Sequence, residues 1–210
     1  MIRNLPAAGT ATIRNATTRS AIGRNGVLGA AVLCAALAAA VAVRVAIGGQ
    51  TVRDGMAAGA VFGVALIAVA LRFGGRIGLP RAASVATGIV GGIVLVGLPG
   101  WLDPLPVPGL GLHPQPFIAW ALVTVIVAAG EEAILRGVLL DALAASLGRP
   151  GAVVLTSVAF ALLHVPLYGW HVVPLDLAVG VWLAGLRLVS GGIAAPAAAH
   201  ALADLATWWM

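Results

Sequence analysis

The sequence contains little charge, and lysine is missing from it altogether. Only 9% of its 210 residues are charged, whereas about a quarter are charged in a typical soluble domain. Meanwhile 61% are hydrophobic, and the mean hydropathy is +1.07. This shortage of charge, together with long apolar runs, excludes an ordinary soluble domain and predicts an integral membrane protein with several spans.

Cysteine is also nearly absent. The single cysteine, Cys34, lies inside the first apolar run and cannot form an internal disulfide. We therefore expect it to pack as a small hydrophobic side chain.

The positive charge comes from arginine alone and gives a net charge of +5. The arginines flank the apolar segments and do not form a basic helix or groove, so nucleic acid is not expected as a partner. Membrane lipid is the expected partner, because arginines at these places typically face anionic headgroups.

Seven apolar segments follow one another along the chain. Each has roughly the twenty residues that a helix needs to cross the hydrocarbon core, and none alternates as a barrel strand would. The predicted fold class is therefore all-α, a polytopic membrane bundle of about seven transmembrane helices. The segments are 27–47, 56–73, 84–101, 117–138, 151–168, 172–190 and 192–209.

Composition divides the chain into three parts. Residues 1–26 form a polar, arginine-rich and acid-free start, which we interpret as a cytoplasmic tail in preference to an organelle transit peptide. Residues 27–116 contain the first helices and a Pro/Gly-rich outer loop. Residues 117–210 contain almost all of the ionisable residues that fall within apolar segments.

Two signals predict the orientation of the bundle. With the N-terminus in the cytoplasm, most loop arginines lie inside, and Arg44 and Arg53 are the exceptions. The aromatic residues then fall near the outer interface, which their amphipathic rings favour. The inner arginines are Arg72, Arg76, Arg81, Arg149 and Arg187, and the outer aromatics are Trp101, Trp120, Tyr168, Trp170, Trp208 and Trp209.

Glycines recur every four residues in two segments. They are Gly55, Gly59 and Gly63 in the second segment and Gly88 and Gly92 in the third. Small residues at this spacing allow helix backbones to approach closely in lipid, so we interpret them as packing positions.

Ionisable residues at membrane depth cost several kcal/mol unless they are paired or hydrated, which makes them candidates for function. The only glutamates of the chain, Glu131 and Glu132, are adjacent and are followed by Arg136. Glu132 and Arg136 are four residues apart and can form an ion pair on one helix face. Glu131 is rotated by about 100° from Glu132 and is free to act as a general base towards water.

The same four-residue spacing occurs on two further helices. Phe160 and His164 share a face of the fifth segment, and His200 and Asp204 share a face of the seventh. If the three faces converge, they enclose a site in which Glu131 joins two histidines and an aspartate. Glu131, His164 and His200 could bind a divalent metal such as zinc with an open position for water, or they could activate water without a metal.

Four other polar residues are not expected to take part in catalysis. We expect Asp176 to cap its helix or lie at the interface, His171 to be interfacial, Asp141 to lie at the inner end of a long fourth helix, and His113 to be exposed in the outer loop.

The three motifs carry a resemblance to a known family. EEAILR, FALLH and HALAD resemble, in order, the EExxxR, FxxxH and HxxxN/D motifs of the CPBP intramembrane proteases. This superfamily, often labelled Abi, includes the CAAX prenyl endopeptidase Rce1 and bacteriocin-immunity homologues. The resemblance covers about residues 117–208 and implies an all-helical membrane endopeptidase that acts on a protein or peptide substrate.

The resemblance also implies roles. Glu131 and His164 would activate the attacking water, and His200 with the residue at 204 would stabilise the oxyanion. The family is described both as metalloproteases and as glutamate proteases, and the absence of HExxH leaves both open. The supporting residues that brace the site would be Glu132, Arg136 and Phe160.

One position departs from the better-known enzymes. Asp204 stands where they carry asparagine, and an ionised aspartate cannot donate a hydrogen bond to an oxyanion. A protonated aspartate can, and we hypothesise that Asp204 is neutral.

The leading hypothesis is an intramembrane endopeptidase near the cytoplasmic face of a prokaryotic plasma membrane. A proton-coupled transporter is the main alternative, because buried Glu, His and Asp also make proton relays, but no inverted repeat is seen. A catalytically inactive binding or immunity protein is the third. The sequence does not specify the substrate, its prenylation or the oligomeric state.

Overall fold

The computed structural model describes residues 26–49, 51–75, 80–102 and 116–209. Helices dominate this part of the chain and it contains no strand, so the predicted all-α class is confirmed. The predicted tail, apart from its last residue, lies outside the described residues, as do Arg76 and the part of the outer loop that holds His113.

Seven α-helices make up the bundle within the described residues. They are α2 (Gly26–Ile47), α3 (Val52–Arg72), α4 (Ala82–Leu102), α5 (Phe117–Glu132), α6 (Leu140–Tyr168), α7 (Val173–Ser190) and α8 (Ala194–Ala206). Three short elements complete them: a π-helix η1 (Ala133–Leu139) between α5 and α6, and the 3-10 helices η2 (Trp170–Val172) and η3 (Thr207–Trp209).

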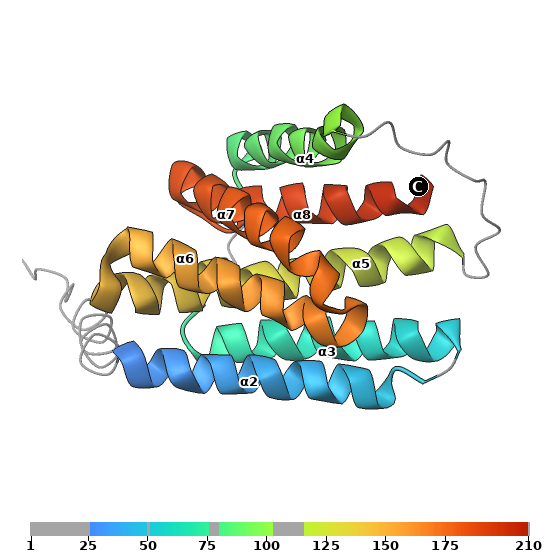
Figure 1. Ribbon diagram of the computed structural model, residues 1–210, viewed down its shortest axis with the longest axis horizontal. Helices are drawn as coiled ribbons and strands as arrows, with labels where there is room; N and C mark the ends of the chain where they lie inside the picture. Colours follow the sequence, from blue (N-terminus) through green and yellow to red (C-terminus); the bar gives the residue numbers. More distant parts are fainter. Residues whose placement is uncertain (1–25, 50, 76–79, 103–115, 210) are drawn as a thin grey trace, which may run out of the picture.

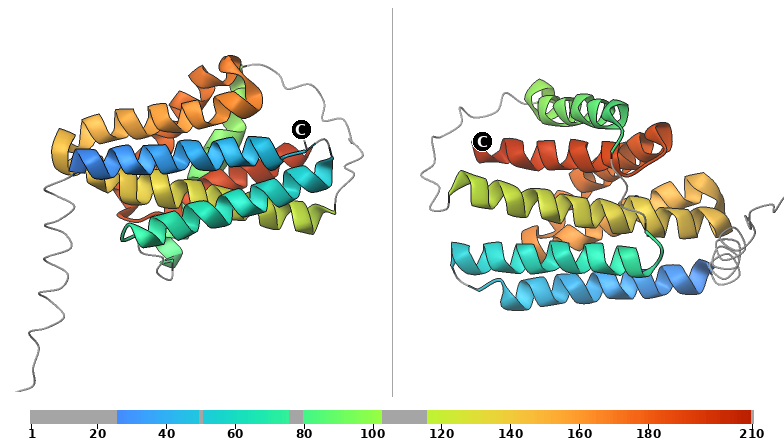
Figure 2. Two further views of the ribbon diagram at one scale, coloured as in Figure 1. Left: turned by 90° about the horizontal axis from the view of Figure 1, so that it is seen from below. Right: turned by 180° about the vertical axis from the view of Figure 1, so that it is seen from behind.

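Five helices lie roughly side by side, in the order α4, α8, α5, α3 and α2 (Figure 1). The further views in Figure 2 show the same order from behind. α6 packs against α2 and α7, and α7 also packs against α8. This arrangement places α5, α6 and α8, which carry the three motifs, next to one another or to a shared neighbour.

Close helix contacts explain four of the five spaced glycines. A Cβ atom on Gly63 would lie 2.8 Å from the carbonyl oxygen of Ile126 in α5, and one on Gly88 would lie 2.4 Å from that of Ala195 in α8. Gly59 and Gly92 are similarly crowded by α5 and α8, whereas Gly55 faces no second helix within 4 Å. The packing interpretation therefore holds for all of them except Gly55.

The predicted fourth and fifth helices are separated by a sharp bend, although the backbone hydrogen-bonding pattern runs through it. Gly148 has φ of 72°, a left-handed conformation that glycine adopts without steric cost, and Pro150 follows it. The bend folds the continuous segment Phe117–Tyr168 back on itself and so brings His164 towards Glu131.

Helix α2 buries one stripe and exposes the other. Leu33, Leu37 and Val41 are buried at helical spacing, while Cys34 is exposed beside this stripe. The prediction that Cys34 is packed was wrong, because it lies one residue, or about 100° of helix rotation, from the buried stripe.

Four helical stretches of the described chain are long and apolar enough to cross a membrane: Gly26–Ile47, Arg53–Arg72, Phe117–Tyr168 and Trp170–Ser190. Ala82–Gly97 is a shorter apolar helix. The protein is thus an integral membrane protein by length and composition, and the count of seven spans and the cytoplasmic N-terminus stay predictions.

Three of the predicted interfacial tryptophans lie together at one end of the bundle. The ring centroids of Trp120 and Trp208 are 4.8 Å apart, and Phe117 contacts both rings and that of Trp209. Such a cluster suits the amphipathic zone between lipid and water.

Candidate active site

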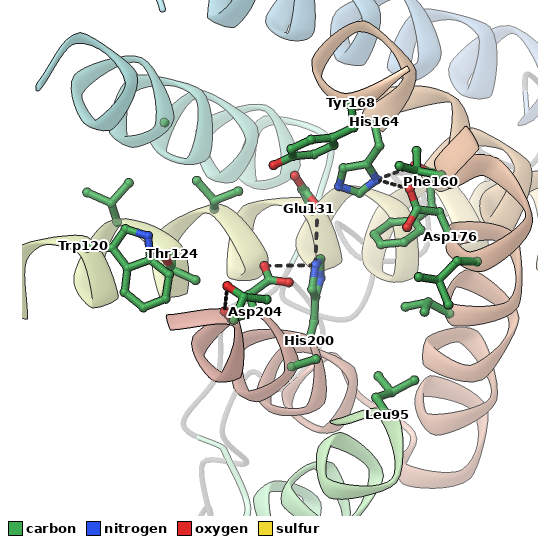
Figure 3. A pocket seen from close by; sticks show the side chains of 18 of the residues that line it. Leu95, Trp120, Thr124, Glu131, Phe160, His164, Tyr168, Asp176, His200 and Asp204 are labelled. Atoms are coloured by element: carbon green, nitrogen blue, oxygen red, sulfur yellow. Dashed lines mark hydrogen bonds and ion pairs between the residues drawn. The ribbon is translucent and has the colours of Figure 1, made fainter. Parts of the chain in front are cut away.

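A cavity of about 760 Å³ lies between the helices, and every one of them contributes to its wall. Most of the lining is apolar, but it includes seven ionisable side chains, and all of them except Arg44 are labelled in Figure 3. They are Arg44 of α2, Glu131 of α5, His164 and Tyr168 of α6, Asp176 of α7, and His200 and Asp204 of α8. The structure thus brings together the four residues that the sequence predicted as catalytic.

Glu131 is 1% exposed but borders this cavity. Its Oε2 atom is 3.8 Å from Nε2 of His200, and its Oε1 atom is 4.0 Å from Nη1 of Arg44. Within the described residues Oε2 has no hydrogen-bond partner. A carboxylate oxygen that is buried, unpartnered and next to a cavity is suited to bind a water molecule.

Glu132 and Arg136 form the fully buried pair that their spacing predicts. Nη1 of Arg136 donates to Oε1 of Glu132 at 2.9 Å, and Nη2 donates to the carbonyl of Gly180 at 3.0 Å. The same Oε1 accepts from Nδ1 of His200 at 3.0 Å. Because a carboxylate paired with arginine only accepts, Nδ1 of His200 carries a proton and Nε2 faces Glu131 and the cavity.

The π-helix η1 begins directly after the two glutamates. A π-helix in this position is rare and typical of functional sites, because its wider turn re-aims side chains. The carbonyl of Arg136 accepts a bond from Nε of Arg187 at 2.9 Å, and Arg187 in turn pairs with Asp141 at 3.2 Å. α7 thereby fixes the irregular turn that holds the glutamates, and Asp141 is exposed as expected for a helix end.

Phe160 is the apolar centre of the site. Its ring meets the imidazoles of His164 and His200 edge-on, with centroids 4.8 and 5.3 Å away. The guanidinium of Arg136 lies 4.6 Å from the centre of the same ring. Phe160 therefore separates the two histidines and fixes the orientation of both.

The interpretation of Asp176 as a cap or interface residue was wrong. It does lie in the first turn of α7, but its Oδ2 atom is 3.3 Å from Nδ1 of His164, inside the cavity. Nδ1 of His164 is also 3.1 Å from the carbonyl of Phe160, which can only accept. The proton of His164 therefore sits on Nδ1, and Nε2 is left with a lone pair. His171, by contrast, is exposed, as expected.

Asp204 is the most open of the four predicted residues. Its Oδ2 atom is 3.5 Å from Nε2 of His200, and 42% of its side chain is accessible. His200 thus has carboxylates on both sides: Glu132 at Nδ1, and Glu131 with Asp204 at Nε2.

Sequence reasoning missed Arg44. Its position near the end of an apolar segment suggested a topology signal, but the guanidinium points inward, 4.9 Å above the ring of Phe62 and within reach of Glu131. It is the only arginine that lines the cavity among the described residues. The signal available in the sequence was that Arg44 falls inside the first predicted apolar segment, 27–47, and not in the loop after it.

The predicted metal ligands do not form a metal centre in this geometry. Within the described ranges, no group of three or more His, Cys, Asp or Glu side chains is placed to hold an ion. Glu131, His164 and His200 surround the cavity without converging on one point.

Comparison with known proteins gives one match. Residues 113–206 match the family model described as Type II CAAX prenyl endopeptidase Rce1-like, and this region contains all three motifs. No curated protein and no solved structure matches the chain. Residues 113–206, a little under half of the chain, are therefore similar to the Rce1-like family of CAAX prenyl endopeptidases.

Proposed function

We propose that this protein is an intramembrane endopeptidase that hydrolyses a peptide bond of a protein or peptide substrate within or beside a prokaryotic plasma membrane. The observation that carries the proposal is the carboxylate of Glu131. It is buried, opens on the cavity, and has an oxygen without a hydrogen-bond partner among the described residues.

Glu131 acts as the general base on water. A water molecule on Oε2 of Glu131, also within reach of the lone pair on Nε2 of His164, loses a proton to the carboxylate as its oxygen bonds to the peptide carbonyl carbon. When the C–N bond breaks, the departing nitrogen takes this proton from Glu131. The carboxylate is thereby restored, and no other reactant is consumed.

His200 stabilises the charge that develops on the carbonyl oxygen. Glu132 holds its Nδ1 proton at 3.0 Å, so a second proton on Nε2 turns that atom into a donor that faces the cavity. The carboxylate of Glu131 favours this protonated form by Coulombic attraction. A neutral Asp204 would supply a second donor.

The test is cleavage by the purified protein in lipid nanodiscs. We expect Glu131→Gln and His164→Ala each to lower kcat by about 10² to 10⁴, the usual contribution of acid–base groups. His171→Ala is the matched control, because this imidazole is exposed and does not line the cavity. Full cleavage by Glu131→Gln would end the proposal.

The substrates should include peptides with and without a C-terminal prenyl group, because the matching family model carries the description CAAX prenyl endopeptidase. Each reaction is repeated after dialysis against a chelator. Cleavage that survives this treatment assigns water activation to the side chains of Glu131 and His164, and cleavage that is lost and then restored by zinc assigns it to a metal.

A further inference from the structure

Asp176 is the one carboxylate of the cavity for which neither the motifs nor the proposed mechanism gives a role. It comes from α7, which carries none of the three motifs, and its Oδ2 atom lies 3.3 Å from Nδ1 of His164. Both side chains are largely enclosed, with 18% and 15% of their surfaces accessible. Figure 3 shows His164 with Asp176 and Phe160 on one side and with Glu131 and Tyr168 on the other.

The two histidines of the site have matching surroundings. Nδ1 of His200 faces Glu132 at 3.0 Å, and Nδ1 of His164 faces Asp176 at 3.3 Å. In each case the carboxylate belongs to a different helix from the histidine, and in each case it lies on the side of the ring away from Nε2. Both imidazoles therefore present Nε2 to the space beside Glu131.

Helix capping does not account for this placement. Asp176 lies in the first turn of α7, where a negative charge is favourable. However, the N-terminus of α7 shows no side-chain cap bond, and the carboxylate contacts the imidazole instead. A capping role alone would also be met by a carboxylate that points out of the cavity.

We propose that Asp176 is a positioning residue for His164, an inference that rests on the proposed function. Together with the carbonyl of Phe160 it keeps the proton of His164 on Nδ1, so Nε2 stays available as an acceptor for water or for a proton in transit. When Nε2 accepts a proton, Asp176 is the anion adjacent to the imidazolium that forms.

The decisive variant is Asp176→Asn, which keeps the size of the side chain but adds an NH₂ donor. An amide that donates to Nδ1 favours the opposite tautomer, in which the proton lies on Nε2. We expect kcat to fall at least about tenfold with KM within about twofold, and Asp176→Glu to recover part of the loss. Asp54→Asn serves as the matched control, because this carboxylate bonds Thr51 at the start of α3 and does not line the cavity.

A second readout does not depend on cleavage. ¹⁵N-histidine NMR of the purified protein should show His164 mainly as the Nδ1–H tautomer, and Asp176→Asn should increase the Nε2–H form. Assignment follows from the signal that His164→Ala removes. Unchanged histidine signals together with unchanged kcat in Asp176→Asn would overturn the inference.

The two readouts distinguish failure of this inference from failure of the proposed function. If Glu131→Gln abolishes cleavage but Asp176→Asn alters neither kcat nor the tautomer, the inference is wrong and the proposed protease stands. If the wild type cleaves nothing but the tautomer depends on Asp176, the positioning contact stands and the proposed reaction does not. A variant that only melts earlier, with kcat per folded molecule unchanged, reduces Asp176 to a structural role.

Discussion

Arg136 is fully buried and carries a permanent positive charge, yet its surroundings compensate nearly all of it. Glu132 lies 2.9 Å away, the carbonyl of Gly180 accepts a second bond, and the ring of Phe160 lies beneath the guanidinium. Only Nε lacks a partner among the described residues. Residues that individually cost several kcal/mol are thus tolerated because they are assembled as one network.

This network predicts a large effect for Arg136→Met. The change leaves Glu132 buried without its counter-ion, so we expect the free energy of unfolding to fall by about 3–5 kcal/mol. Unfolding in mixed micelles, followed by circular dichroism, measures it. The double variant Glu132→Leu/Arg136→Met should recover part of the loss, and a double variant less stable than Arg136→Met alone would contradict the explanation.

Asp204 allows the oxyanion role to be tested separately from water activation. Asp204→Asn keeps a donor next to Nε2 of His200, so we expect kcat to stay within the same order of magnitude at neutral pH. Asp204→Leu removes the donor and should lower kcat by about 10²-fold. Loss of cleavage in Asp204→Asn would show that the carboxyl group itself is needed.

Helices α3 and α5 approach each other closely at Gly63 of α3 and Gly130 of α5. A Cβ atom on Gly130 would lie 2.6 Å from the carbonyl oxygen of Gly63 and 3.1 Å from Cβ of Leu66. Because Gly130 directly precedes Glu131, the distance between these helices also sets the position of the carboxylate in the cavity.

We therefore expect Gly130→Ala to destabilise the protein by about 1–3 kcal/mol, the usual cost of overpacking, and to lower cleavage as well. Gly185→Ala is the matched control, since nothing lies within 4 Å of a Cβ built there. Unfolding and kcat are measured on both variants. Equal stability of the two would show that α3 and α5 can separate freely.

Local signals in the sequence predicted most of the helices and the Glu132–Arg136 pair, because hydropathy and four-residue spacing act within one segment. They failed for Asp176 and Arg44. The carboxylate of Asp176 is directed inward by the packing of α7 against α6, and the guanidinium of Arg44 by the packing of α2 against α3 and α6. No periodicity within either helix marks such a tertiary contact in advance.

For the whole molecule, the orientation in the membrane is the main expectation still to be measured. Leu147 lies at the Gly148 bend, near the start of α2, and Trp170 lies between α6 and α7. Both side chains are exposed, at 51% and 72%. With the N-terminus in the cytoplasm, Leu147 faces inward and Trp170 faces outward.

This prediction is tested by single-cysteine labelling in a Cys34→Ala background. A membrane-impermeant maleimide should modify Trp170→Cys in intact cells and Leu147→Cys only after permeabilisation. The Cys34→Ala parent without a new cysteine is the control for background. The reverse pattern would show that Leu147 faces outward and Trp170 faces the cytoplasm, which would overturn the predicted orientation.

The shortness of α8 has a further consequence. Its 13 residues span about 20 Å, against a hydrocarbon layer of about 30 Å. If α8 spans the membrane between α4 and α5, we expect the bilayer to thin locally at the helix that carries His200 and Asp204. Local thinning would shorten the path that water takes to the cavity. It would also shorten the path that a polypeptide substrate takes through the bilayer.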